Sequence, residues 1–155
     1  MRLALFEPDI AQNTGTILRM AACLGVAVDV IEPLGFVFSD RRLKRAGMDY
    51  LDRVELVRHA SWDDFRAARA TAGGRLVALA ARAETRYVDF AFRADDVILM
   101  GRETAGLPGA VEAAAQARLR IPMVTGNRSL NVAIAAALVV GEALRQTGTF
   151  PTETT

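Results

Sequence analysis

Short apolar runs that alternate with helical patterns are the feature of this chain that most restricts its fold. Strands that alternate with helices predict a mostly parallel sheet covered by helices on both faces. We therefore expect an α/β fold with a mostly parallel six-stranded sheet, in one domain over residues 1–147 with a flexible tail at 148–155. The expected strands are residues 3–6, 26–31, 54–57, 75–80, 96–100 and 119–121.

Local signals at helix ends place four helices between or after these strands. Asn13 can cap a helix that Gly25 ends, and Ser61 begins a capping-box pattern that leads to a helix ending near Thr71. Pro108 favours a helix start, with an end near residue 117. Ser129 or Asn131 is expected to cap the last helix, which runs to residue 147.

Three loop signatures follow probable strands. The first covers residues 7–15, with Arg19 just inside the next helix; the second covers residues 99–108, and the third residues 121–132. Open α/β sheets build their ligand sites from loops at the carboxyl ends of parallel strands. Three such loops in one domain predict a ligand site at that edge of the sheet.

Several classes of site are absent from the sequence. No G-x-G-x-x-G dinucleotide pattern, no P-loop and no G-x-S-x-G nucleophile elbow occurs. One histidine, His59, and one cysteine, Cys23, cannot form a common zinc site, so no metal is expected. His59 is interpreted as structural or exposed, and Cys23, among apolar neighbours, as a buried and inert thiol.

Composition bears on location and assembly. Apolar residues make up 52% of the chain, a surplus that predicts a buried interface between subunits. Residues 132–140 are apolar on every side of the last helix, so this helix should be buried against the sheet and a partner subunit. The same run is too short to span a membrane, and residues 3–6 are too short for a signal-peptide core. With a single cysteine, this favours a cytoplasmic protein without a membrane partner.

Charge gives no general sign of nucleic-acid binding, because the net charge is +1. A local basic patch does exist. Taken alone it fits a solvated surface, but it could also supply phosphate contacts to an RNA. Its members are Arg41, Arg42, Lys44 and Arg45, and Arg128 is a weaker candidate in the third loop.

Taken together, the three loop signatures resemble motifs 1, 2 and 3 of the SPOUT superfamily of S-adenosylmethionine-dependent RNA methyltransferases. The resemblance is to the branch that methylates the ribose 2′-oxygen, and it covers about residues 2–147. It rests on N-x-G-x-x-x-R over residues 13–19, G-x-E-x-x-G-L over 101–107, and I-P-M at 121–123 with S-L-N at 129–131. Residues 31–36 and 41–47 further resemble the minimal tRNA wobble-nucleotide methyltransferases of the superfamily.

The resemblance implies a C-terminal trefoil knot, a homodimer, S-adenosylmethionine as cofactor and tRNA as partner. It implies a catalytic role for Arg19, which reaches the substrate ribose, with Asn13, Ser129 and Asn131 orienting the ribose or cofactor. Because a guanidinium is a poor base near neutral pH, we interpret Arg19 as a phosphate ligand that stabilises the developing alkoxide. The implied cofactor-binding residues are Leu79, Gly101, Glu103, Ile121, Pro122, Met123, Ser129 and Leu130, with Glu103 anchoring the loops.

The expected function is thus methylation of the wobble ribose of a cytidine or uridine in the tRNA anticodon loop. Three alternatives stay open. The first is 2′-O-methylation of another tRNA or rRNA position. The second is a non-catalytic RNA-binding protein of the same fold. The third is a flavodoxin-like or receiver-like domain. The absence of an acidic cluster after the first strand argues against the receiver-like domain.

Overall fold

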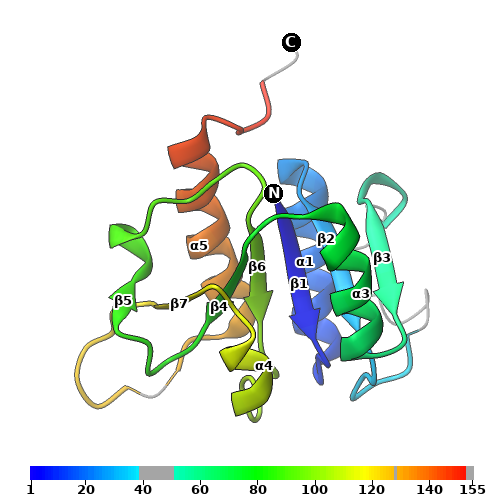
Figure 1. The fold of residues 1–155 in the computed structure, drawn as a ribbon, viewed down its shortest axis with the longest axis horizontal. Coiled ribbons are helices and arrows are strands. Elements are labelled where there is room, and N and C mark those ends of the chain that lie inside the picture. Colours follow the sequence, from blue (N-terminus) through cyan, green and yellow to red (C-terminus); the bar gives the residue numbers. More distant parts are fainter. Residues whose placement is uncertain (39–50, 128, 153–155) are drawn as a thin grey trace.

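In the part of the chain that the structure describes, seven short strands pair into one sheet in which all neighbouring strands are parallel (Figure 1). The computed structural model describes residues 1–38, 51–127 and 129–152. The order across the sheet is β3-β2-β1-β6-β4-β7-β5. The strands are β1 (Arg2–Phe6), β2 (Ala27–Ile31), β3 (Leu56–His59), β4 (Leu76–Leu79), β5 (Thr85–Arg86), β6 (Val97–Met100) and β7 (Ala117–Arg120).

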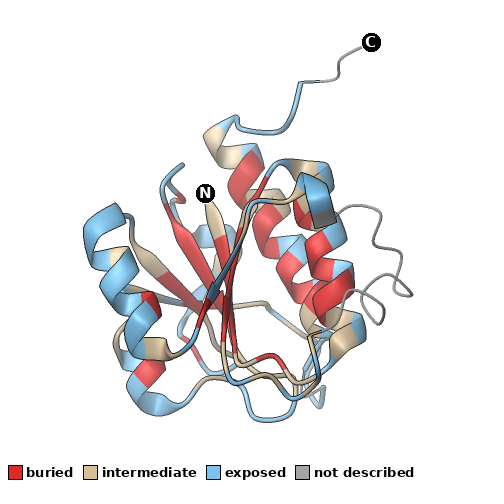
Figure 2. Ribbon diagram, turned by 90° about the vertical axis from the view of Figure 1, so that its right-hand side faces the viewer, coloured by how far each residue is buried: buried red, intermediate tan, exposed pale blue. Residues whose placement is uncertain are grey.

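Helices cover both faces of the sheet, as the alternating pattern predicts. α1 (Ala11–Leu24) and α5 (Val132–Thr147) share one apolar core with the strands, whereas α3 (Trp62–Ala72) and α4 (Gly109–Ala113) pack on the other face around Phe65 and Val111. Figure 2 shows the buried strands between these two layers. Two 3₁₀ turns, η1 (Leu51–Arg53) and η2 (Tyr87–Asp89), lie in the connections. The expected fold class is confirmed.

The sheet contains one more strand than expected. The two residues of β5 pair with β7 through Thr85↔Leu119 and Arg86↔Arg120. Their segment is polar and lies outside the six expected strands, because a two-residue edge strand leaves no alternating apolar pattern in the sequence. The helix expected to start at Pro108 also ends early, at Ala113, since the backbone N–H of Gln116 already bonds to the Leu76 carbonyl (2.9 Å) where β7 begins.

Helix α1 differs from expectation at its start. It begins at Ala11, its N-cap residue is Ile10, and no side chain caps it. Asn13 therefore lies in the first turn, and its side chain serves contacts with other loops. The end at Gly25 is confirmed: this residue has φ 66°, and its N–H bonds to the Ala21 carbonyl.

The burial predicted for Cys23 is wrong, because the thiol is exposed. Helix α1 buries a stripe spaced at three and four residues that includes Thr14, Leu18 and Ala21. Cys23 follows Ala21 by two residues, which is about 200° around a helix, so it lies on the opposite side. The apolar residues next to Cys23 in the sequence do not show on which side of the helix it lies.

Helix α5 is buried on one side and open on the other. Ala136, Val139 and Val140 are fully buried against the sheet, but Ile134 is 53% exposed and Leu138 is 41% exposed. These two residues lie one turn apart on the same side of the helix. The all-round apolar pattern therefore leaves an uncovered apolar strip on this chain. No helix in the described part of the chain is long and apolar enough to cross a membrane.

Candidate functional site

A pocket of about 590 Å³ opens at the carboxyl ends of β4, β6 and β7. Strands β1, β2 and β3 extend to one side of β6 and strands β4, β7 and β5 to the other, so the pocket lies near the point where the strand order reverses. Its lining comes from the ends of these strands, from the loops that follow them, and from the N-terminal ends of α1 and α5. The lining residues are Ile10, Asn13, Leu79, Ala80, Ala81, Met100, Gly101, Arg102, Glu103, Thr104, Ala105, Gly106, Ile121, Met123, Ser129, Leu130, Asn131, Val132 and Ala135.

The loop after β6 closes tightly on itself beside the pocket. Arg102 and Gly106 exchange two backbone hydrogen bonds, of 3.1 and 2.9 Å. Gly106 has φ +68°, a conformation that side chains disfavour, and a Cβ added to Gly101 would lie 2.4 Å from the Gly106 carbonyl carbon. The two glycines therefore allow the compact loop, which presents backbone groups to the pocket.

A polar network joins the three loops with the sequence signatures. The Glu103 carboxylate accepts hydrogen bonds from the Asp9 backbone N–H (3.0 Å) and the Asn13 side-chain amide (3.3 Å). Asn13 Oδ1 in turn accepts from Asn131 Nδ2 at 2.9 Å. Asn131 also caps α5, because its Oδ1 accepts from the N–H groups of Ala133 and Ile134. One chain of side chains thus links the first, second and third loops.

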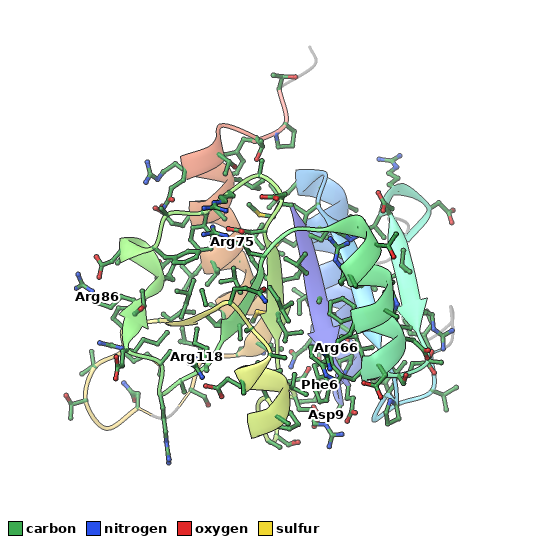
Figure 3. All side chains as sticks on the ribbon, viewed as in Figure 1. Phe6, Asp9, Arg66, Arg75, Arg86 and Arg118 are labelled. Atoms are coloured by element: carbon green, nitrogen blue, oxygen red, sulfur yellow. The ribbon has the colours of Figure 1, made fainter. Side chains whose placement is uncertain are left out.

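Two carboxylates lie side by side in this network. Burial raises the pKa of Glu103, and the adjacent Asp9 side chain raises it further. The pKa of Asp9 is lowered, mainly by its hydrogen bonding with Glu103 and also by the Thr104 hydroxyl. Figure 3 labels Asp9 just beyond the carboxyl end of β1, next to Phe6. The pair therefore holds a charge on Asp9 and makes Glu103 the easier of the two to protonate.

Most of the residues singled out in the sequence meet at this pocket. The lining includes Asn13, Leu79, Gly101, Glu103, Ile121, Met123, Ser129, Leu130 and Asn131. Pro122 instead lines a neighbouring hollow of about 680 Å³ that also reaches Tyr87 and Leu138. Arg19 is exposed on α1 and is not part of the lining. The candidate RNA-binding residues Arg41, Arg42, Lys44, Arg45 and Arg128 lie outside the described residues.

Sequence reasoning missed several residues of the pocket. They include Ile10, Met100, Arg102 and Thr104, which stand beside residues that the motifs did select. Their positions inside the same loops were a usable signal. Asp9 was also missed as part of the network, because its role depends on a contact with Glu103 that is 94 residues away in the chain.

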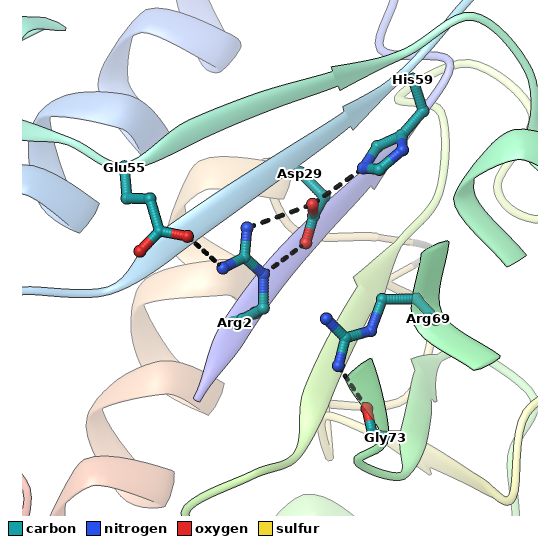
Figure 4. A network of polar contacts seen from close by, with 6 residues as sticks. All are labelled: Arg2, Asp29, Glu55, His59, Arg69 and Gly73. Atoms are coloured by element: carbon teal, nitrogen blue, oxygen red, sulfur yellow. Dashed lines mark hydrogen bonds and ion pairs between the residues drawn. The ribbon is translucent and has the colours of Figure 1, made fainter. Parts of the chain in front are cut away.

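A second polar cluster lies away from the pocket and joins the start of β1, the middle of β2 and the end of β3 (Figure 4). The buried Asp29 carboxylate accepts from Arg2 Nε at 2.8 Å and contacts His59 Nε2 at 2.9 Å. His59 is 8% exposed and packs edge-on against the Phe65 ring. Asp29 is the largest contribution to the raised pKa of Arg2. The structural interpretation of His59 is confirmed.

The fold and the site together define a class: an open parallel α/β domain with a pocket between loops at the carboxyl ends of its strands. The chain belongs to the SpoU rRNA Methylase family, whose model matches residues 1–141. This agrees with the resemblance found in the three loop signatures.

Named relatives are similar to nearly the whole chain. A tRNA (cytidine(34)-2′-O)-methyltransferase from Beijerinckia indica is 60% identical over 146 residues, which cover 94% of this chain and 91% of that protein. A solved structure described as giving insights into the 2-OH methylation of C/U34 on tRNA has a TM-score of 0.88 and 43% identity, with 94% of each chain covered. The SpoU methyltransferase AviRb from Streptomyces viridochromogenes, solved with the cofactor AdoMet, has a TM-score of 0.83 and 30% identity, covering 94% of this chain and 60% of that one.

Proposed function

We propose that this protein transfers a methyl group from S-adenosylmethionine to the ribose 2′-oxygen of the wobble nucleotide, a cytidine or uridine, in the tRNA anticodon loop. The observation that carries the proposal is the pocket at which all three signature loops meet, with Glu103, Asn13 and Asn131 joined by hydrogen bonds. The similarity to the Beijerinckia tRNA methyltransferase over almost the full length supports the substrate.

The residues of the pocket fit the cofactor. A volume of about 590 Å³ suits a ligand of nucleoside size, and apolar side chains such as Leu79, Ile121 and Met123 can flank an adenine ring. Backbone groups around Gly101 can read the edge of that ring, while Asn13, Ser129 and Asn131 can bind hydroxyl or amino-acid groups. Bound there, S-adenosylmethionine would supply a methyl group on a positively charged sulfur, an electrophile that needs no further activation.

The protein's own residues then have to align and stabilise the attacking oxygen. In the transfer a C–O bond would form at the ribose oxygen as the C–S bond broke, with the bonding pair left on sulfur and the hydroxyl proton passing to solvent. We assign Arg19 to the ribose side, where its cation binds an adjacent phosphate and stabilises the developing alkoxide. Alignment supplies much of the remaining rate enhancement, because near-attack geometry alone can contribute several kcal/mol.

A homodimer would complete this site. Support comes from the apolar strip of Ile134 and Leu138 on α5, which is exposed in this protomer, and from Arg19, which is exposed on α1 outside the pocket of its own chain. A second copy of the chain that packs a helix against this strip could bring its own Arg19 to the pocket. Leu138→Arg should then produce a monomer without activity in sedimentation and methylation assays, and a wild-type protein that is an active monomer would contradict the assignment.

The substrate contacts proposed for Arg41, Arg42, Lys44, Arg45 and Arg128 rest on the sequence. A protein of nearly neutral net charge must bind phosphates through local basic groups, and such binding weakens steeply with salt. The trefoil knot of the superfamily and a cytoplasmic location likewise stay predictions.

The direct test is methylation of tRNA transcripts and native tRNAs with labelled S-adenosylmethionine, followed by nucleoside mapping. We expect the label on the 2′-oxygen of the wobble nucleotide, and calorimetric binding of the cofactor that survives addition of a chelator. Label at another tRNA or rRNA position would overturn the substrate assignment. Failure to bind the cofactor would overturn the enzymatic function altogether.

A further inference from the structure

Asp9 connects the loop after β1 to the loop after β6 through both its backbone and its side chain. Its backbone N–H donates to Glu103 Oε2 at 3.0 Å, and its Oδ1 accepts from the Glu103 backbone N–H at 3.2 Å. Its second oxygen accepts from the Thr104 hydroxyl. Each carboxylate thus accepts a hydrogen bond from the backbone of the other residue. This pair of hydrogen bonds joins two loops from distant parts of the chain.

The backbone of Asp9 is equally constrained on its other side. The Gly35 N–H donates to the Pro8 carbonyl at 3.0 Å, and a Cβ added to Gly35 would lie 2.6 Å from both Cα and Cβ of Asp9. Gly35 belongs to the segment that follows β2 and leads along the chain toward the basic residues at 41–45. Asp9 is therefore fixed between this segment and the second signature loop.

Asp9 itself does not line the pocket, but the groups it orients do. Glu103, Thr104 and Asn13 are all lining residues, and Glu103 receives the Asn13 amide. We propose that Asp9 is a positioning residue for methyl transfer, which acts through Glu103 on Asn13 and Asn131. This inference rests on the proposed function, and it adds a residue of the first signature loop that does not line the pocket itself.

The chemistry of the contacts requires a carboxylate at position 9. Its two oxygens accept from an N–H on one side and an O–H on the other, and an ionised carboxylate is an acceptor at both oxygens. An asparagine would turn an NH₂ group toward one of these donors. Asp9→Asn therefore keeps the shape of the side chain while it removes the charge and one acceptor.

The proposal is tested with Asp9→Asn, Asp9→Ala and a matched control, Asp63→Ala, which removes an exposed carboxylate on α3. We expect the Asp9 variants to lower kcat by roughly 10- to 100-fold, because small displacements of aligned groups have large effects on rate. The control should retain wild-type kcat. Thermal unfolding of each protein shows whether it is folded at the assay temperature.

A pH profile separates positioning from a merely structural role. Ionised Glu103 is an acceptor only, which matches the Asp9 N–H and the Asn13 amide that donate to it, whereas protonation turns one of its oxygens into a donor. Activity should therefore fall at low pH as Glu103 is protonated. Asp9 contributes to the raised pKa of Glu103. Arg102, the cation beside Glu103 in the sequence, is paired with Glu7. Asp9→Asn should therefore move the acid limb of the kcat profile to lower pH, and Glu103→Gln should abolish that limb.

The possible outcomes are distinct. Asp9 variants with wild-type kcat and an unchanged acid limb would overturn the inference, as would a loss of kcat with the limb in its original place. A wild-type protein that methylates no tRNA would instead overturn the proposed function. In that case calorimetry would compare the cofactor affinity of the wild type with that of Asp9→Asn. Equal affinities would also contradict the positioning role.

Discussion

Asn131 donates its side-chain amide to Oδ1 of Asn13 at 2.9 Å, a contact between residues 118 positions apart in the chain. The first residue caps α5 and the second lies in the first turn of α1. The N-terminal ends of two helices are thereby held together at the mouth of the pocket. The contact gives Asn131 two separable roles, in the stability of α5 and in the geometry of the site.

Two substitutions at position 131 should separate these roles. Asn131→Ala removes the cap and is expected to lower the free energy of unfolding by about 0.5–2 kcal/mol, measured by urea denaturation. Asn131→Asp retains a good cap but loses the amide donor to Asn13, so it should keep the stability and lose methyl transfer. Equal activity of wild type and Asn131→Asp would show that the contact with Asn13 has no catalytic importance.

The tight loop after β6 makes a second prediction. Gly101→Ala places a methyl group where the Gly106 backbone lies, so the loop must open and cofactor binding should be lost in calorimetry. Gly109→Ala is the matched control, because the added Cβ at the start of α4 would meet no atom within 4 Å apart from its chain neighbours and its own helix backbone. Normal affinity in Gly101→Ala would mean that the closed loop is not needed for binding.

Arg19→Ala should lower methyl transfer while cofactor affinity stays near the wild-type value. The loss of one transition-state charge contact corresponds to roughly 3–4 kcal/mol, or about 10²–10³ in rate. Single-turnover kinetics with tRNA and calorimetry with the cofactor provide the two measurements. Near-normal turnover would remove Arg19 from the mechanism.

A mixed dimer tests which subunit supplies Arg19. One subunit carries Arg19→Ala and the other Gly101→Ala, so neither subunit has both an intact pocket and its own arginine. If Arg19 acts on the partner's pocket, one of the two sites is complete and about half of the wild-type activity returns. An inactive mixture would instead assign Arg19 to its own subunit.

The ion pair between Arg2 of β1 and the buried Asp29 of β2 predicts a large effect on stability away from the site. Asp29→Ala leaves Arg2 and His59 without their shared acceptor and should cost about 3–5 kcal/mol of unfolding free energy. Glu55 also accepts from Arg2, but its side chain is 69% exposed, so Glu55→Ala should cost less than about 1 kcal/mol. Urea denaturation of both variants checks the difference, and similar losses would contradict it.

The raised pKa of Glu103 also predicts how stability depends on pH. As the pH rises above the ordinary value of 4.5, Glu103 loses its proton first in the unfolded chain, and the folded protein becomes less stable relative to Glu103→Gln. The unfolding free energy of the wild type should therefore fall relative to that of Glu103→Gln as the pH rises. The difference should level off once the pH passes the pKa of Glu103 in the folded protein. A constant difference across this range would show that burial does not perturb Glu103.

The fold class could be predicted because apolar periodicity is a local property. The expected strand at residues 3–6 and the expected helix after Ser61 both occur, and Ser61 does accept from the Asp64 N–H as a cap should. The short strand β5 could not be predicted, since two residues carry no periodicity and pairing with β7 defines it. The exposure of Cys23 was missed for a similar reason: its face of α1 depends on where the helix meets the sheet.

The candidate site divides in the same way. Loop residues such as Asn13, Gly101 and Ser129 could be recognised from the order and spacing of the signatures. Their side-chain contacts could not, because spacing along the chain does not determine which atoms meet. Asn13 suggested a helix cap in the sequence, but in the fold it connects Glu103 to Asn131.

By itself, the sequence determined the alternation of strands and helices and the three loops that identify the family, because both are patterns within short stretches of consecutive residues. Only the tertiary structure decided that Asp9 and Glu103 hold each other across 94 positions, and that Ile134 and Leu138 stay exposed in the part of α5 that is apolar all round. Such relations depend on the order of strands in the sheet, which brings distant segments together. Hydrogen bonds and burial follow from that proximity in space.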